Sequence, residues 1–278
     1  MPRGARMRSA NPRTPGSPAV DAVLHNLARR IPTDCCIALV VAHPDDEILA
    51  AGASLHLMTN LLLVHVTDGA PRGLDDAARA GFDSPEAYAA ARQAELSRAL
   101  LLARCNAART GLGIPDQDAS KAIPAIARSL AQLFAQHGTQ VVITHAYEGG
   151  HPDHDATALA VHAAAPGGVI EFPGYHAGLD GSFVAGKFLP GPPATDILLD
   201  DEERALKRAL FDCFPTQARI LAEFGTTAER FRPARPDFSE PPHPGTLNYE
   251  HWGWGMTGER WRALATAALA ELEPPCAA

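Results

Sequence analysis

The stretch that decides the fold is CIALVVAHPDDE, residues 36–47. Its first part, Cys36 to Ala42, is apolar and rich in β-branched side chains, which is typical of a strand buried on both faces of a sheet. We expect this strand to end at His43-Pro44. Asp45-Asp46-Glu47 should then begin a helix that runs to about Thr59, because acidic side chains in a first turn interact favourably with the helix dipole.

Further strands and helices alternate along the chain after this stretch. Buried strands are predicted over Leu61–Thr67 and Gln140–Thr144, with a shorter one near Leu112–Pro115. Helices are predicted over Ser84–Arg104, with Ser84 as N-cap, and over Gln117–His137. This alternation predicts an α/β fold with a parallel sheet and helices on both faces.

The second half of the chain is less regular. We predict a strand over Val169–Tyr175, a loop over Gly178–Pro193 and an extended, turn-rich segment over Arg232–Pro244. Helices are expected over Asp201–Phe211, Gln217–Glu223 and Gly258–Leu272. Residues 1–18 are expected to form a flexible basic tail, and residues 19–278 a single domain with a divergent C-terminal part.

Composition excludes several classes of protein. The 278 residues are 46% hydrophobic and 20% charged, and the formal net charge is −8. A nucleic-acid-binding surface would show a basic excess, and no apolar stretch approaches the roughly 18–20 residues of a membrane span. The five cysteines have no CxxC spacing, so we expect reduced, buried thiols and a cytoplasmic location. The oligomeric state stays open.

Polar residues follow three of the predicted strands. They are His43 to Glu47, Thr67-Asp68-Gly69, and His145 with the loop that reaches His151 to Asp155. Ligands of an open parallel sheet bind outside the carboxyl ends of its strands. All three segments are therefore expected to open onto one crevice.

Two His-Pro-Asp motifs in this crevice suggest a metal site. A catalytic zinc commonly takes two histidines and one carboxylate and keeps one position for water. His43 and Asp46 are three residues apart across a strand-to-helix turn, and His154 would supply the third ligand from the far loop. Either motif alone could be a solvated polar loop, but the pair favours a metal, and the ligand set suits zinc and iron alike.

Three neighbours of these ligands are candidates for the chemistry. Asp45 lies close enough to act as general base for a water that the metal acidifies. His151, if protonated, would stabilise the oxyanion of a tetrahedral intermediate. Asp153 is expected to orient His151 and to favour its charged form.

At this point the sequence resembles a known family. Segments 40–52 (VVAHPDDEILAAG) and 144–157 (THAYEGGHPDHDAT) are similar to the two characteristic segments of the LmbE/PIG-L family of zinc-dependent N-acetylglucosaminyl de-N-acetylases. The similarity extends to LLLVHVTDGAPR (61–72), ARQAEL (91–96) and LGIPDQD (112–118). The resemblance implies a Rossmann-like three-layer sandwich with a mostly parallel sheet. It places His43, Asp46 and His154 at the zinc ligands, Asp45 at the base, and His151 at the group near the oxyanion or leaving amine.

The resemblance also suggests substrate-binding residues. Arg92 stands where the family has an arginine implicated in substrate contact, and Asp116 stands where an acidic side chain would meet sugar hydroxyls. An exposed helix arginine paired with Glu95 is the structural alternative for Arg92. The stretch from Gly174 onward has no family counterpart that aligns. Its Trp252 and Trp254 are either packing anchors or rings that stack on a sugar.

These observations predict a metal-dependent hydrolase that removes an N-acetyl group from an N-acetylglucosamine-type sugar in a small metabolite or glycoconjugate. One alternative is an amidase that cleaves a larger acyl group from a sugar-linked amine. Another is a non-catalytic sugar-binding α/β protein, for which an intact ligand set would be unnecessary. A dinucleotide-dependent oxidoreductase is disfavoured, because no GxGxxG follows the first strand.

Overall fold

The computed structural model describes residues 17–273, and its central feature is a seven-stranded sheet. Most of the predicted tail at residues 1–18 lies outside these residues. The strand order is β3-β2-β1-β4-β5-β9-β8, in which the first five strands are parallel and the last two are antiparallel additions. The strands are β1 Thr33–Val41, β2 Met58–Pro71, β3 Ala108–Asp116, β4 Val141–His145, β5 Gly168–Phe172, β8 Thr195–Leu198 and β9 Ala228–Pro233.

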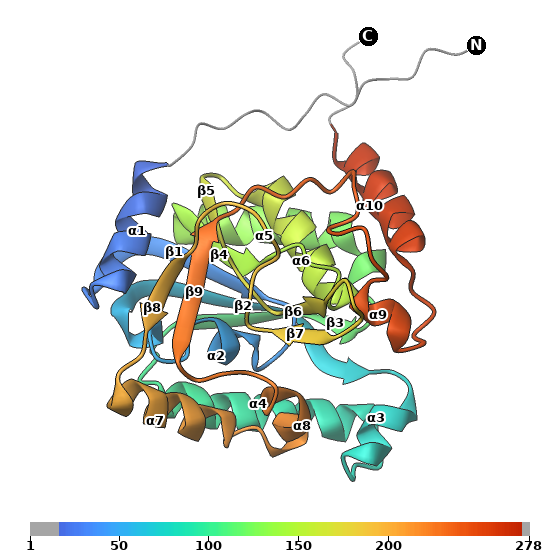
Figure 1. Cartoon of the computed structure of the whole chain (residues 1–278), viewed down its shortest axis with the longest axis horizontal. Helices are drawn as coiled ribbons and strands as arrows, with labels where there is room; N and C mark the ends of the chain where they lie inside the picture. Colours follow the sequence, from blue (N-terminus) through green and yellow to red (C-terminus); the bar gives the residue numbers. More distant parts are fainter. Residues whose placement is uncertain (1–16, 274–278) are drawn as a thin grey trace.

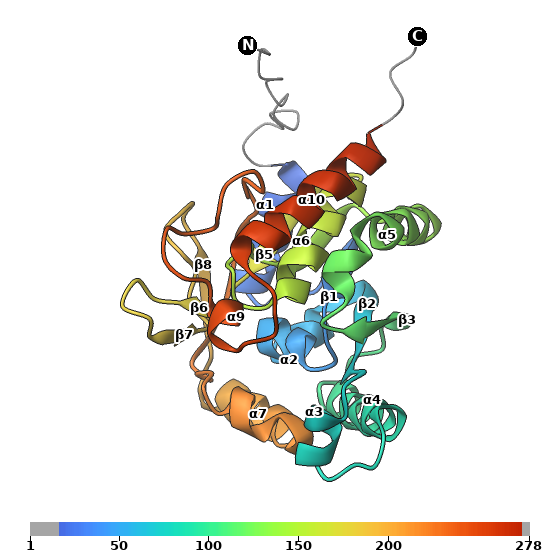
Figure 2. The same cartoon turned by 90° about the vertical axis from the view of Figure 1, so that its right-hand side faces the viewer.

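Helices cover both faces of this sheet, so the fold is the predicted three-layer α/β sandwich (Figures 1 and 2). Alternate residues of β1 face opposite layers: Leu39 packs with the helices α1, α2, α4 and α7, and Val40 packs with α5, α6 and α10. The main helices are α1 Pro18–Ala28, α2 Asp46–Ala51, α4 Pro85–Leu102, α5 Ile123–His137, α6 Pro152–Ala164, α7 Asp201–Phe211 and α10 Gly258–Leu272. The shorter helices are α3 Leu74–Arg79, α8 Ala218–Leu221, α9 Asn248–His251 and the 3₁₀ turns Leu55–Leu57, Ala119–Lys121 and Pro215–Gln217.

Three predicted helices begin or end elsewhere. The helix predicted over Gln217–Glu223 is the 3₁₀ turn Pro215–Gln217 followed by α8, and tertiary hydrogen bonds explain the other two differences. The helix after β1 ends at Ala51 instead of about Thr59, because the N–H of Ala53 donates to the buried carboxylate of Glu229. The helix predicted from Gln117 begins only at Ile123. The N–H groups of Gln117 and Ala119 donate to Asp153 instead of to helical carbonyls, and Pro124 occupies the first turn, where its missing N–H costs nothing.

The irregular second half contains short strands that the sequence pattern does not predict. The single strand predicted over Val169–Tyr175 is two strands, β5 and β6 Tyr175–Ala177. The segment predicted as a loop, Gly178–Pro193, contains β7 Phe183–Ala185, which pairs with β6 in a separate two-stranded sheet. The helices predicted over Asp201–Phe211 and Gly258–Leu272 have those bounds.

Two observations concern membrane crossing and the thiols. No helix within residues 17–273 is both long and apolar enough to span a bilayer. Cys35, Cys36, Cys105 and Cys213 are free thiols as predicted, but each is half-buried where full burial was expected. Cys276 lies outside the described residues.

A buried ion pair connects α7 to β9 and to the end of α2. Lys207 is 1% exposed, and its Nζ lies 2.7 Å from Oε1 of Glu229 and donates to the carbonyl of Leu49. Glu229 also accepts hydrogen bonds from the Ala53 N–H and the Ser54 hydroxyl. The pair therefore joins α7, β9 and the turn that follows α2.

We expect Lys207→Met to lower the free energy of unfolding by about 3–5 kcal/mol, because it leaves the Glu229 carboxylate buried without its cation. Denaturant unfolding would measure this loss. Arg128→Met is the control, since Arg128 pairs with Glu271 at the surface and such pairs contribute about 1 kcal/mol or less. Equal, small losses in the two variants would contradict a structural role for the buried pair.

Candidate metal centre and catalytic site

The site lies where the strand order of the sheet reverses direction. β1 and β4 are parallel neighbours, but the chain leaves β1 for α2 on one face and leaves β4 for α6 on the other. Side chains at the carboxyl ends of two such strands line a common crevice. His43 follows β1 closely, His145 ends β4, and His154 lies in the first turn of α6.

Three of the predicted side chains meet at one point. Nδ1 of His43 lies 3.2 Å from Nε2 of His154 and 3.3 Å from Oδ2 of Asp46, and Nε2 of His154 lies 3.4 Å from Oδ1 of Asp46. Two ligands of a tetrahedral zinc, each about 2.0–2.1 Å from the metal, stand roughly 3.3 Å apart. The donor set therefore fits a divalent metal in both spacing and chemistry.

The electrostatics of this point favour positive charge. Burial acts against ionisation of Asp46, but the neighbouring His154 holds its pKa well below the usual value. Burial likewise opposes a charged His43, yet Asp116 and the other nearby carboxylates raise the pKa of that imidazole well above its ordinary value. A cation bound among the three donors would be stabilised by the same nearby carboxylates.

Two carboxylates support His43 from behind. Its Nε2 lies 3.1 Å from Oδ1 of Asp116 and 3.5 Å from Oδ2 of Asp153. Ligating histidines commonly donate their second ring N–H to a carboxylate, which fixes the tautomer and the ring orientation. The Asp153 carboxylate thus contacts His43, and the contact of Asp153 with His151 is made by its backbone N–H, which donates to Nδ1 of His151.

Asp45 is held in a strained and buried position beside the three donors. Its φ of 142° is a conformation that L-residues rarely adopt and that costs of order 1–3 kcal/mol, a kind of strain that clusters at functional sites. Burial, together with the charge of Asp46, raises the pKa of Asp45 to about 8, while Arg92 acts in the opposite direction. A carboxylate with a raised pKa is a stronger base than an ordinary aspartate.

Arg92 is the residue that fixes Asp45. It is 3% exposed, and its Nη2 donates to Oδ2 of Asp45 at 2.9 Å and to the carbonyl of Pro44, while Nη1 donates to the carbonyl of Gly69. The alternative of an exposed arginine paired with Glu95 is therefore wrong. Glu95 accepts from the backbone N–H and the hydroxyl of Thr216 instead.

His151 is neutral in this arrangement. Burial and the adjacent His43 lower its pKa well below the ordinary value, so the expected charged form is not favoured. Nδ1 of His151 accepts the backbone N–H of Asp153, which leaves the ring proton on Nε2. That Nε2 lies 3.7 Å from Oδ1 of Asp116. His151 can therefore act as a neutral hydrogen-bond donor.

His145 belongs to the site, although sequence reasoning gave it no role. Its ring stacks on His154 with centroids 4.0 Å apart and planes 11° apart, and its Nε2 accepts the N–H of Ala42 and lies 3.4 Å from Oδ2 of Asp46. Burial lowers its pKa to about 4, so the ring is neutral. The available signal was its position at the end of β4, which corresponds to that of His43 after β1.

Comparison with known proteins agrees with this geometry. The PIG-L family model, described as GlcNAc-PI de-N-acetylase, matches residues 38–165. The resemblance to the LmbE/PIG-L family is confirmed. All of the donors and the candidate base lie within the matched stretch, and no curated protein matches the chain significantly.

Solved structures share the LmbE-like fold. A deacetylase of the teicoplanin biosynthetic pathway (the Orf2*T triple mutant) is similar at a TM-score of 0.57 and 19% identity, over 72% of this chain and 98% of that one. The N,N'-diacetylchitobiose deacetylase of Pyrococcus horikoshii is similar at 0.51 and 15% identity, over 85% and 98%. GalB, the 4-carboxy-2-hydroxymuconate hydratase of Pseudomonas putida KT2440, is similar at 0.50 and 16% identity, over 73% and 98%.

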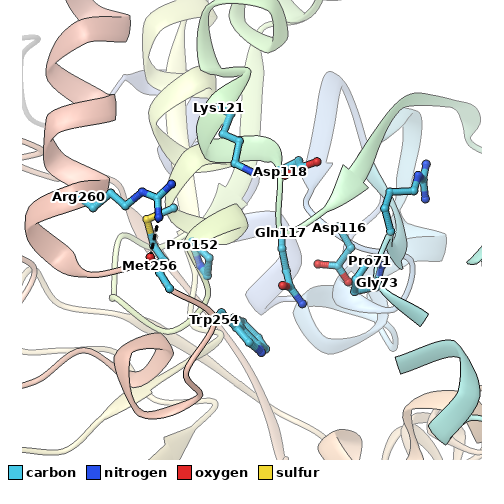
Figure 3. Close-up of a pocket in the computed structure, with 12 residues that line it drawn as sticks. Pro71, Gly73, Asp116, Gln117, Asp118, Lys121, Pro152, Trp254, Met256 and Arg260 are labelled. Atoms are coloured by element: carbon cyan, nitrogen blue, oxygen red, sulfur yellow. Dashed lines mark hydrogen bonds and ion pairs between the residues drawn. The ribbon is translucent and has the colours of Figure 1, made fainter. Parts of the chain in front are cut away.

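Residues beyond the PIG-L match cover the candidate metal centre. Tyr175 lies 5.4 Å from His154 between ring centroids, and Trp254 lies 4.9 Å from His151 in an edge-to-face arrangement. Next to them is a cavity of about 240 Å³ whose wall includes Trp254 and Asp116 (Figure 3). The C-terminal part of the chain, which the family motifs leave undescribed, therefore shapes the approach to the site.

Proposed function

We propose that this protein is a metal-dependent hydrolase that removes the N-acetyl group from an N-acetylglucosamine-type amino sugar in a small metabolite or glycoconjugate. The observation that carries the proposal is the close approach of the His43, Asp46 and His154 donors beside the strained base candidate Asp45. The match to the GlcNAc-PI de-N-acetylase model and the deacetylases of similar fold support the same reaction.

His43, Asp46 and His154 would hold the metal, with Zn²⁺ or Fe²⁺ both compatible with this ligand set. When bound, such a metal polarises the amide carbonyl and acidifies water. Asp116 and Asp153 hold the ring of His43 from its other nitrogen. Asp116 also faces the cavity, and we assign to it contact with sugar hydroxyls.

Asp45 would take a proton from the attacking water, whose oxygen bonds to the amide carbon. Arg92, which anchors Asp45 at 2.9 Å, acts here as a positioning residue. Both terminal nitrogens of Arg92 already bind protein groups, so contact with substrate is a secondary role for it. The C–N bond then breaks, and the amine leaves with the proton that Asp45 had taken.

His151 would donate its Nε2–H to the developing oxyanion. We expect His151→Ala to lower kcat by about 10²–10³ because one oxyanion donor is lost. Metal stoichiometry should be unchanged, since the donors of His43, Asp46 and His154 remain. Steady-state kinetics with metal analysis would measure both, and His25→Ala on the exposed side of α1 is the control. Turnover close to that of the wild-type protein would reject this role.

The experiment that tests the proposed reaction compares acyl groups on one sugar. Acid release from N-acetyl-, N-butyryl- and N-octanoylglucosamine would be measured with the metal-loaded protein. We expect acetate to be released with the highest kcat/KM. Preference for a longer chain would favour the amidase alternative, and release of no acid with intact sugar binding would favour the non-catalytic sugar-binding protein.

A further inference from the structure

The cavity beside the metal centre has one aromatic wall and one polar wall. Figure 3 shows the ring of Trp254 on one side and the side chains of Asp116 and Gln117 extending toward the same space. Its volume of about 240 Å³ is below the roughly 300–1,000 Å³ of pockets for drug-sized ligands, so it suits a single small ring. The lining also includes the cationic side chains of Arg72, Lys121 and Arg260.

The loop that carries Trp254 is built to present its ring. Gly253 and Gly255 have φ values of 71° and 69°, a conformation that glycine adopts without strain, so the chain turns on both sides of the tryptophan. Glu250 holds the base of the loop by accepting the N–H groups of Leu247 and Gly258. Trp254 nevertheless remains 37% exposed, which is unusual for a ring whose role is packing.

The cavity adjoins His151 and Asp116 at the candidate metal centre. Trp254 contacts His151 edge-to-face, and Asp116 lies 3.7 Å from Nε2 of the same histidine. A sugar ring in the cavity would therefore lie beside the candidate catalytic groups, close to the amide on which they would act.

Two of the three cationic side chains around the cavity are paired with carboxylates. Arg72 pairs with Asp68, and Lys121 pairs with Asp118. Arg260 donates to the carbonyl of Gly255. Among the remaining polar groups, the Asp116 carboxylate and the Gln117 amide are suited to bind hydroxyls. This combination favours a neutral polyol ring over an anion.

We propose that Trp254 is the platform on which the apolar face of the substrate's pyranose ring stacks, with the ring hydroxyls toward Asp116 and Gln117. This assignment rests on the proposed function and names a specificity residue outside the PIG-L match. The flat indole offers a large apolar area at low conformational cost.

The test is sugar binding by the metal-loaded protein. Calorimetry would measure the Kd of glucosamine, the expected product, for the wild-type protein, Trp254→Leu, Trp254→Phe and Trp252→Phe. We expect Trp254→Leu to bind about 3- to 30-fold more weakly, because an aliphatic group of similar polarity has no flat face. Trp254→Phe should bind nearly as well as the wild-type protein. Trp252→Phe should do so too, because the ring of Trp252 contacts Trp254, with centroids 4.5 Å apart, but does not line the cavity.

Intrinsic fluorescence provides a second, independent readout. Glucosamine should change the emission of the wild-type protein and of Trp252→Phe, and this change should be lost in Trp254→Phe. Wild-type affinity in Trp254→Leu, or no glucosamine binding by the wild-type protein, would overturn the platform. Binding restricted to glucosamine 6-phosphate and abolished by Arg260→Gln would overturn it in favour of an anion site.

The two proposals fail in different ways. If Trp254 affects sugar affinity but no sugar amide is hydrolysed, the proposed reaction is wrong and the platform stands. If acetate is released with unchanged KM in Trp254→Leu, the reaction stands and the platform is wrong.

Discussion

Asp45→Asn is expected to lower kcat by about 10²–10⁴, the range for loss of a general base, while the metal stays bound at wild-type stoichiometry. The amide cannot accept the proton of the attacking water. It has the size of the carboxylate, and asparagine tolerates the positive φ of this position better than most residues. Kinetics with the acetylated sugar and metal analysis of the same preparation measure the two quantities.

Asp21→Asn serves as the matched control, because Asp21 lies exposed in the first turn of α1. Its turnover should equal that of the wild-type protein. Loss of metal in Asp45→Asn would make Asp45 a ligand and overturn its assignment. Full turnover in that variant would exclude it as the base.

His154→Ala should abolish stoichiometric metal binding and, with it, activity. The substitution removes one of three side chains whose nearest donor atoms lie 3.2–3.4 Å apart in pairs, and His43 and Asp46 remain. Competition with a chromogenic chelator would measure the change in metal affinity. His162→Ala, on the same helix α6, should retain the metal. A His154→Ala protein that keeps one metal per chain would remove His154 from the ligand set.

The sequence predicted that the side chains of His43, Asp46 and His154 would meet, because their placement depends on local rules. The end of an apolar, β-branched run in the sequence marks the carboxyl end of a buried strand. When β1 and β4 are parallel neighbours, their carboxyl ends lie side by side. His43 and Asp46 are related by a single turn of chain. His154 needed only the second strand to be assigned correctly, as Gln140–Thr144 was to within one residue at each end.

The residues whose roles differ depend on contacts between distant segments. Asp153 contacts His43 because α6 packs beside β1, which no spacing within the second motif indicates. Arg92 is buried because β2 extends to Pro71 and brings Gly69 against α4. Trp254 reaches the site from far along the chain, in a segment without a family counterpart. Hydrophobic periodicity indicates the type of a single helix or strand. It therefore cannot predict which side chains of distant segments come into contact.

The fold alone does not determine the reaction. GalB, a hydratase, shares this architecture with deacetylases of the teicoplanin and chitobiose type. The conclusion therefore depends on the side chains at the metal centre and on what they do with an amide.

The most direct test is acetate release from methyl N-acetyl-β-glucosaminide, with metal per chain measured before chelation, after chelation and after reloading with Zn²⁺ or Fe²⁺. We predict about one metal per chain and acetate release that is lost on chelation and restored on reloading, consistent with three donors and an open water position. Acetate release that persists without metal, or a protein that takes up no metal on reloading, would contradict the account.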